Sequence, residues 1–182
     1  MNSSDIVTKK VQTWLTEVVI GLNLCPFANQ PYIQQKIKFQ VSSAQNLEQL
    51  TEELEQTMQT LHKTPSDEVE TLLFIVPRLL KDFYEYNDYL EIADQMLENN
   101  QLTGIFQIAS FHPNYRFDGL VSGSVENLTN RAPYPIFHFL REETLTKVID
   151  SYPDVDAIPD NNIEKMHALS KTQIRTLFPF LN

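Results

Sequence analysis

The chain has 182 residues, 42% of them hydrophobic, and a formal net charge of −10 with an isoelectric point near 4.8. This length and composition predict one soluble domain that spans residues 1–182 and buries a sizeable core. A surface rich in carboxylates repels phosphate groups, so neither nucleic acid nor an anionic membrane is expected as a partner.

The sequence also indicates a compartment. The N-terminal residues are polar, and the longest apolar runs, such as residues 72–76, are too short to span a bilayer. Cys25 is the only cysteine, so the chain forms neither an intrachain disulfide nor a thiolate zinc cluster. These features predict a cytoplasmic protein, and they leave its oligomeric state undetermined.

Helical and extended patterns alternate along the first 110 residues. Apolar residues recur at helical spacing from Val7 to Leu22, with Gly21 near the expected end, from Leu47 to Leu61, and from Phe83 to Leu97. Extended runs occupy residues 36–42, 71–76 and 105–110. This order predicts an α/β fold with a small, mainly parallel sheet of about three strands covered by helices. The alternative is α+β, if one strand runs antiparallel.

A loop rich in Gly, Pro and Asn follows, and two further helices are expected after it. The first should begin near Pro135, a residue suited to the first turn of a helix. On this helix His138 and Arg141 would point toward the buried side, and Glu142 would lie at its rim, one turn from His138. A buried Arg141 needs a carboxylate, backbone carbonyls or a ligand as its partner.

Polar groups follow the ends of the predicted strands. Ligands of open α/β sheets bind beyond the carboxyl ends of parallel strands. The residues that leave these ends are Ser42, Ser43, Arg78 and His112. We therefore expect them to converge on one edge of the sheet.

The scarce basic residues are concentrated between residues 111 and 142. This segment contains three of the five arginines and two of the four histidines, namely Arg116, Arg131, Arg141, His112 and His138. With Arg78 added, the predicted edge is locally positive, which suits a small anion that bears phosphate or carboxylate. In the alternative interpretation the arginines pair with the protein's own carboxylates, or His138 and Arg141 tie the preceding loop to the core.

Cys25 has two interpretations. It is a nucleophile if a histidine serves as its base, or a small buried hydrophobe. The end of the preceding helix disfavours a thiolate, whereas a new turn that begins at Pro26 would favour one. A metal ion held by His138, Glu142 and His112, with Cys25 as a further ligand, is a separate hypothesis. No other cofactor is predicted.

Three motifs occur in the order GLNLCPFA at 21–28, FHPNYRF at 111–117 and NRAPYPIFHFLRE at 130–142. Together they resemble an uncharacterised bacterial family of about this length, and the resemblance covers nearly the whole chain. It implies a soluble, single-domain bacterial protein without an assigned activity. Its motif positions add Asn23 and Asn130 to the candidate residues.

Three functions are compatible with these observations. The first is an enzyme that acts on a small anionic metabolite and uses a histidine as acid or base. Its candidate catalytic residues are His112, His138, Cys25 and Glu142, and its candidate binding residues are Arg131, Arg141, Arg78, Arg116, Asn130 and Asn23. The second is a small-molecule-binding or regulatory module without turnover, and the third is a structural or partner-binding protein.

Overall fold

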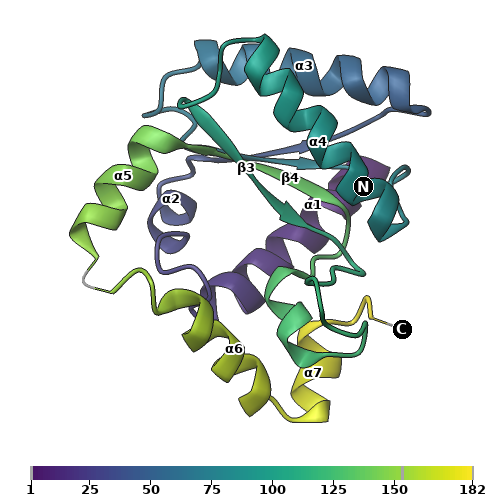
Figure 1. Cartoon of the computed structure of the whole chain (residues 1–182), viewed down its shortest axis with the longest axis vertical. Coiled ribbons are helices and arrows are strands. Elements are labelled where there is room, and N and C mark those ends of the chain that lie inside the picture. The colour runs from purple at the N-terminus through teal and green to yellow at the C-terminus, as the bar shows by residue number, and fades with distance from the viewer. Residues whose placement is uncertain (1, 153, 182) are drawn as a thin grey trace.

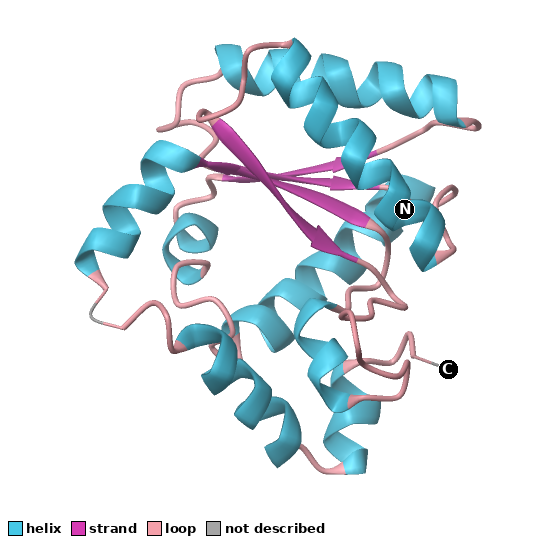
Figure 2. Cartoon of the chain, viewed as in Figure 1, coloured by secondary structure: helices cyan, strands magenta, loops and turns pink. Residues whose placement is uncertain are grey.

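The sheet contains four strands. The computed structural model describes residues 2–152 and 154–181. The strands are β1 (Ile37–Val41), β2 (Thr71–Ile75), β3 (Phe106–Phe111) and β4 (Ile136–Arg141), in the order β1-β2-β4-β3 across the sheet (Figure 2). β1 pairs parallel with β2, whereas β4 pairs antiparallel with both β2 and β3. The first three strands therefore point the same way, and β4 runs against them between β2 and β3.

The mixed α/β organisation is confirmed, but the prediction of about three mainly parallel strands is wrong. The three extended runs found in the sequence correspond to β1, β2 and β3. The strand that was missed is β4. The helix expected from Pro135 onward is instead strand β4 followed directly by helix α5 (Glu142–Ser151). Helices cover β4 on both faces, so its apolar residues do not alternate with polar ones as they do in a half-buried strand.

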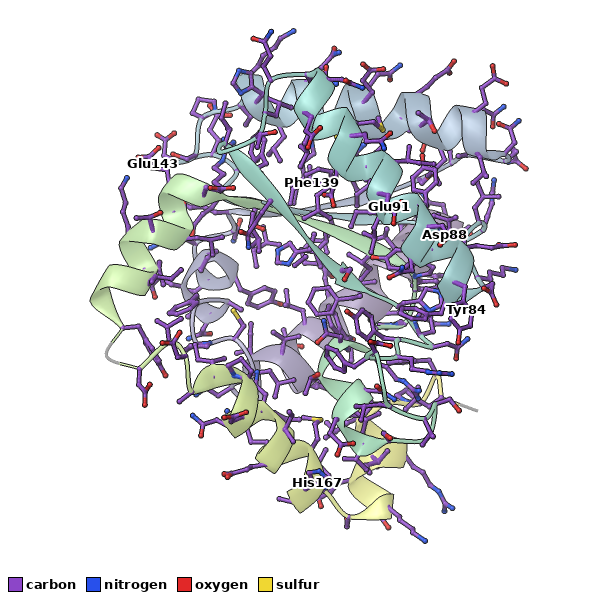
Figure 3. The ribbon with its side chains drawn as sticks, viewed as in Figure 1. Tyr84, Asp88, Glu91, Phe139, Glu143 and His167 are labelled. Atoms are coloured by element: carbon purple, nitrogen blue, oxygen red, sulfur yellow. The ribbon has the colours of Figure 1, made fainter. Side chains whose placement is uncertain are left out.

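Helices α3 (Leu47–Lys63) and α4 (Phe83–Asn99) cover one face of the sheet (Figure 1). Each begins at a side-chain cap, Asn46 for α3 and Asp82 for α4. Phe139 of β4 lies on this side of the sheet (Figure 3). The buried side chains of this layer include Leu54, Met58, Leu72, Phe74, Tyr86, Phe106, Phe137 and Phe139.

Helix α1 (Ser3–Trp14) covers the opposite face and continues into a wider π-helical segment, η1 (Leu15–Ile20). Gly21 follows η1, as the sequence predicts, and a Cβ atom there would collide with the carbonyl oxygen of Glu17. The same side of the sheet carries α2 (Asn29–Ile33), η2 (Val125–Asn130), α5, α6 (Ile158–Ala168) and α7 (Lys171–Leu177) (Figure 1). Among the described residues, no helix is both long and apolar enough to cross a bilayer.

Successive residues of β4 alternate between these two layers. Ile136 packs in the α1 layer, and Phe137 and Phe139 pack in the α3–α4 layer. His138 consequently faces α1, whereas Arg141 reaches toward the end of α3. The two residues, expected on one side of a helix, therefore point to opposite faces of the sheet.

Candidate functional site

Hydrogen bonds within the chain occupy the polar groups beyond the carboxyl ends of β1 and β2. The hydroxyls of Ser42 and Ser43 each donate to the Glu53 carboxylate at 2.5 Å. The exposed Arg78 donates to the carbonyl oxygen of Ser43 at 3.2 Å. The groups that were expected to receive a ligand at this edge therefore bind one another.

His112 is fully buried just beyond β3, and both of its ring nitrogens have partners. Nδ1 accepts from the backbone N–H of Asn114 at 3.0 Å, so Nε2 carries the proton and donates to the Leu80 carbonyl at 3.0 Å. The ring also packs against Tyr86. Burial lowers the pKa of His112 below its ordinary value and thus favours the neutral form. His112 connects the end of β3 to the segment at Leu80, and neither of its nitrogens is free for acid–base chemistry.

Arg131 and Asn130 fasten the long loop between β3 and β4. Arg131 donates from Nε to the Tyr115 carbonyl at 3.3 Å and from a terminal nitrogen to the Ser122 carbonyl at 2.5 Å. The side-chain amide of Asn130 donates to the Ser110 carbonyl at 3.2 Å. Both side chains therefore hold backbone carbonyls, in agreement with a structural role for this motif.

We expect Arg131→Ala to loosen residues 115–122 while the sheet stays intact. The substitution removes two hydrogen bonds to partly exposed loop carbonyls, so the free energy of unfolding should fall by about 1 kcal/mol. Hydrogen exchange followed by mass spectrometry should show faster exchange in this loop alone. Arg116→Ala, which removes an exposed arginine of the same loop, is the matched control. Equal exchange in the two variants would contradict a fastening role for Arg131.

Arg116 and Asn23 lie on the surface. Arg116 has no hydrogen-bond or ion-pair partner among residues 2–152 and 154–181. The carbonyl of Asn23 accepts from Lys165 Nζ at 2.6 Å, and Asn23 lines a surface groove beside α6. Both residues thus lie outside the cavity described below.

Arg141 binds the backbone at the C-terminal end of α3. Its Nε donates to the Val69 carbonyl at 3.0 Å, and one terminal nitrogen donates to the carbonyls of Leu61 at 3.0 Å and Thr64 at 2.7 Å. The guanidinium carbon lies 5.2 Å from the centroid of the Phe106 ring. Of the three kinds of partner expected for a buried Arg141, the structure has backbone carbonyls.

Glu142 begins α5 and does not share a helix face with His138. The pair was expected one helical turn apart, but His138 belongs to a strand. This removes the geometry on which a metal site with His112 was based. The part of the chain that the structure describes contains no group of three or more His, Cys, Asp or Glu side chains that could hold a metal ion.

A cavity of about 210 Å³ lies between the sheet and the helices on its α1 face. We call it the sheet cavity. Its helical and loop wall contains Trp14, Leu15, Val19, Phe27, Ala28 and Pro31. The wall formed by the sheet and α5 contains Ile37, Leu73, Ala109, Phe111, Leu140, Leu145 and Val148. Because Ile37 and Thr71 begin β1 and β2, the cavity extends to the amino ends of these strands, opposite the edge predicted from the sequence.

The polar groups of this cavity are few. They are Cys25, Glu70, Thr71, His138, Arg141, Thr144 and the indole N–H of Trp14, which donates to the Arg131 carbonyl. Three of the residues singled out in the sequence thus line this cavity, Cys25, His138 and Arg141, although the guanidinium group of Arg141 extends away to the carbonyls near the end of α3. The structure places His112, Arg78 and Arg131 elsewhere.

His138 is held in the sheet cavity by Thr71. Its Nε2 lies 2.6 Å from the Thr71 hydroxyl oxygen, which itself lies 2.7 Å from the Phe139 carbonyl oxygen. The other ring nitrogen, Nδ1, has no hydrogen-bond partner among the described residues. In the same part of the chain, the only fully buried side-chain polar atom without a partner is Asn162 Oδ1, so Nδ1 keeps some accessible surface although the ring as a whole is largely removed from bulk water. His138 lines the cavity, which is the space where a partner for this nitrogen could bind.

The protein around His138 disfavours its charged form. Removal of the ring from bulk water lowers the pKa of His138 from 6.5 to about 4. The histidine is therefore neutral at physiological pH.

Cys25 lines the cavity on the loop that follows η1. Burial raises the pKa of its thiol, although hydrogen bonds from the backbone N–H groups of Phe27 and Ala28 act in the opposite direction. The neutral thiol therefore predominates, and the environment is not that of an activated nucleophile.

Thr71 is the residue of the candidate site that the sequence did not reveal. It opens a continuous apolar run, where a threonine is unremarkable because its branched side chain suits a strand. The pairing of β2 with β4 brings it to His138. A polar residue at the start of an otherwise apolar strand was the only signal available.

The fold and the cavity define an α/β protein with a mixed four-stranded sheet and a mainly apolar cavity on one face of that sheet. The model of the family described as "Protein of unknown function (DUF1415)" matches residues 6–176, and the chain belongs to this family. No curated protein and no solved structure matches the chain.

Proposed function

We propose that this protein binds a small, mainly apolar molecule in the sheet cavity. The proposal is based on a neutral histidine, His138, whose unpartnered nitrogen faces an otherwise mainly apolar cavity. A polar atom removed from bulk water without a partner costs free energy. A ligand that donates a hydrogen bond to this nitrogen would recover that free energy, and this gain would favour binding in the cavity.

The dimensions of the cavity limit the size of the ligand. An apolar protein cavity of about 150 Å³ is large enough to bind benzene. The sheet cavity, at about 210 Å³, therefore suits a single ring with a small substituent or a short branched chain.

An anion suits this cavity poorly. A carboxylate or phosphate moved into apolar surroundings needs a paired cation to offset its lost hydration. The cation that lines the cavity is Arg141, whose Nε and one terminal nitrogen are already bound to three carbonyls. An enzyme acting on an anionic metabolite stays a prediction from the sequence, as does an acid–base role for His138.

The proposal can be tested through Trp14, the only tryptophan of the chain, which lines the sheet cavity. We expect toluene or phenol to change the fluorescence of Trp14 saturably and to raise the midpoint of thermal unfolding. Binding should also shift the NMR signals of methyl groups around the cavity. If neither compound binds saturably, the proposal is wrong.

Filling the cavity should abolish this binding. Ala109 lies opposite His138 in the β3–β4 pair and lines the cavity, so Ala109→Leu places a larger side chain in the space of the ligand. We expect the affinity for toluene to fall by at least about tenfold, with a modest loss of stability from overpacking. Gln107→Leu is the matched control, because Gln107 is an exposed residue of the same strand outside the cavity. Unchanged affinity in Ala109→Leu would place the ligand elsewhere.

A further inference from the structure

The hydrogen bonds around Thr71 determine which nitrogen of His138 carries the proton. The Phe139 carbonyl can only accept, so the Thr71 hydroxyl uses its single proton to donate to it at 2.7 Å. The hydroxyl oxygen then accepts at 2.6 Å from His138, whose Nε2 must be protonated. A neutral imidazole carries one N–H, so Nδ1 is a bare acceptor.

From this geometry we infer that the ligand of the sheet cavity is a neutral hydrogen-bond donor on a small apolar body, and that it donates to Nδ1 of His138. Phenols, small alcohols and heteroaromatic compounds with an N–H belong to this class. The inference rests on the proposed function and adds the chemical class of ligand to it.

The other polar groups at the cavity agree with this class. The carboxylate of Glu70 offers acceptors, and the hydroxyl of Thr144 can either donate or accept. The thiol of Cys25 is only a weak donor. The strong donors are Arg141, whose Nε and one terminal nitrogen reach across to carbonyls at and beyond the end of α3, and the indole N–H of Trp14, which already donates to the Arg131 carbonyl at 2.9 Å. A ligand whose polar group is an acceptor thus finds little to bind, whereas a donor finds Nδ1.

Phenol and toluene form a matched pair for the test, because they differ by a hydroxyl in place of a methyl group. At pH 7 we expect phenol to bind the full chain about tenfold more tightly than toluene, as one well-formed hydrogen bond in a desolvated site allows. Benzoate, which has the same ring but a negative charge, should show no saturable binding. Isothermal titration calorimetry and Trp14 fluorescence both measure these affinities.

Two variants locate the preference at His138. His138→Phe keeps a ring and removes the acceptor. The affinity of this variant for phenol should therefore fall to its affinity for toluene, and the affinity for toluene should stay as in the parent. Thr71→Val keeps the branched shape and removes the hydroxyl that fixes the tautomer of His138. It should therefore reduce the preference for phenol without lowering the affinity for toluene. Thr71→Val also provides the test if His138→Phe does not fold.

The outcomes separate the inference from the proposed function. If phenol and toluene bind the parent equally well, or if benzoate binds best, the inference is overturned and the cavity still binds a small molecule. If neither phenol nor toluene binds, both proposals fail. Nitrogen NMR of the labelled imidazole gives an independent result: a protonated Nε2 and a bare Nδ1 support the inference, and the opposite tautomer overturns it.

Discussion

Arg141→Ala is expected to lower the free energy of unfolding by about 3 kcal/mol, because it removes the guanidinium donor from three carbonyls, of which, within the described part of the chain, only that of Leu61 also accepts from a backbone N–H. The guanidinium group holds the carbonyls of Leu61, Thr64 and Val69, and it lies over the Phe106 ring. Leu61 belongs to the last turn of α3 and its carbonyl also accepts from the N–H of Thr64, whereas Thr64 follows the end of α3, where backbone carbonyls have no i+4 helical donor. The positive charge also interacts favourably with the negative end of the helix dipole.

Urea unfolding monitored by circular dichroism measures this loss, which should lower the thermal midpoint by roughly 6–12 °C. Arg141→Lys keeps the charge but lacks the planar group that reaches three carbonyls, so it should recover only part of the stability. Arg175→Ala, at an exposed arginine with no partner among the described residues, is the matched control and should stay within about 0.5 kcal/mol of the parent. If Arg141→Ala changed the free energy of unfolding as little as Arg175→Ala, water would satisfy the three carbonyls in the absence of the guanidinium group. Arg141 would then again be a candidate for ligand binding.

The sequence predicted the elements whose patterns are local. Helix α3 has Leu50, Leu54 and Leu61 on one side and glutamates on the other, which is a helical pattern in any surroundings. Strand β2 is buried along its whole length and reads as a continuous apolar run. Such patterns require no knowledge of which partner covers them.

Strand β4 could not be recognised in this way. Pro135 suits the first turn of a helix, and the apolar pattern continues without a break from β4 into α5. What makes residues 136–141 a strand is pairing with β2 and β3, which lie far away in the sequence. The error then propagated to the site, since a period of two rather than 3.6 decides where His138 and Arg141 point.

The site was predictable to the extent that it depends on rare side chains in apolar surroundings. Cys25 and His138 stood out for that reason, and both line the sheet cavity. The partners of Arg131 and Arg141 could not be recognised in the sequence, because they are backbone carbonyls, which every residue carries. Sequence composition therefore suggested a cluster of arginines available to a ligand, whereas in the structure Arg131 and Arg141 are bound to the backbone.

His138 should make the protein less stable in mild acid. Its pKa is lowered by burial to about 4 in the folded protein, against 6.5 for an unperturbed histidine. Between these pH values the unfolded chain binds a proton that the folded protein does not, so the free energy of unfolding falls as the pH falls. The loss begins below about pH 7, amounts to about 3 kcal/mol at pH 4, and levels off only below that pH, once the folded protein also binds the proton.

His138→Gln isolates this contribution, because glutamine does not titrate and its amide can still donate to Thr71. Urea unfolding of the parent and the variant between pH 7 and pH 4 should give curves that diverge toward acid, with the parent losing more. The remaining titratable and charged groups at the cavity are Cys25, Glu70 and Arg141, and both proteins contain them. Burial also lowers the pKa of His112, which both proteins share, so its effect cancels in the difference. His62→Gln, at an exposed histidine, is the matched control and should leave the divergence in place.

Ligand binding should move this transition. A donor bound to Nδ1 stabilises the neutral imidazole, so it lowers the pKa of His138 further in the folded protein. With saturating phenol the loss of stability should extend to lower pH, whereas toluene, which has no donor, should raise stability without moving the transition. Parallel curves for the parent and His138→Gln would mean that water reaches the ring in the folded protein. The cavity would then lack the desolvated acceptor on which the preference for a neutral donor depends.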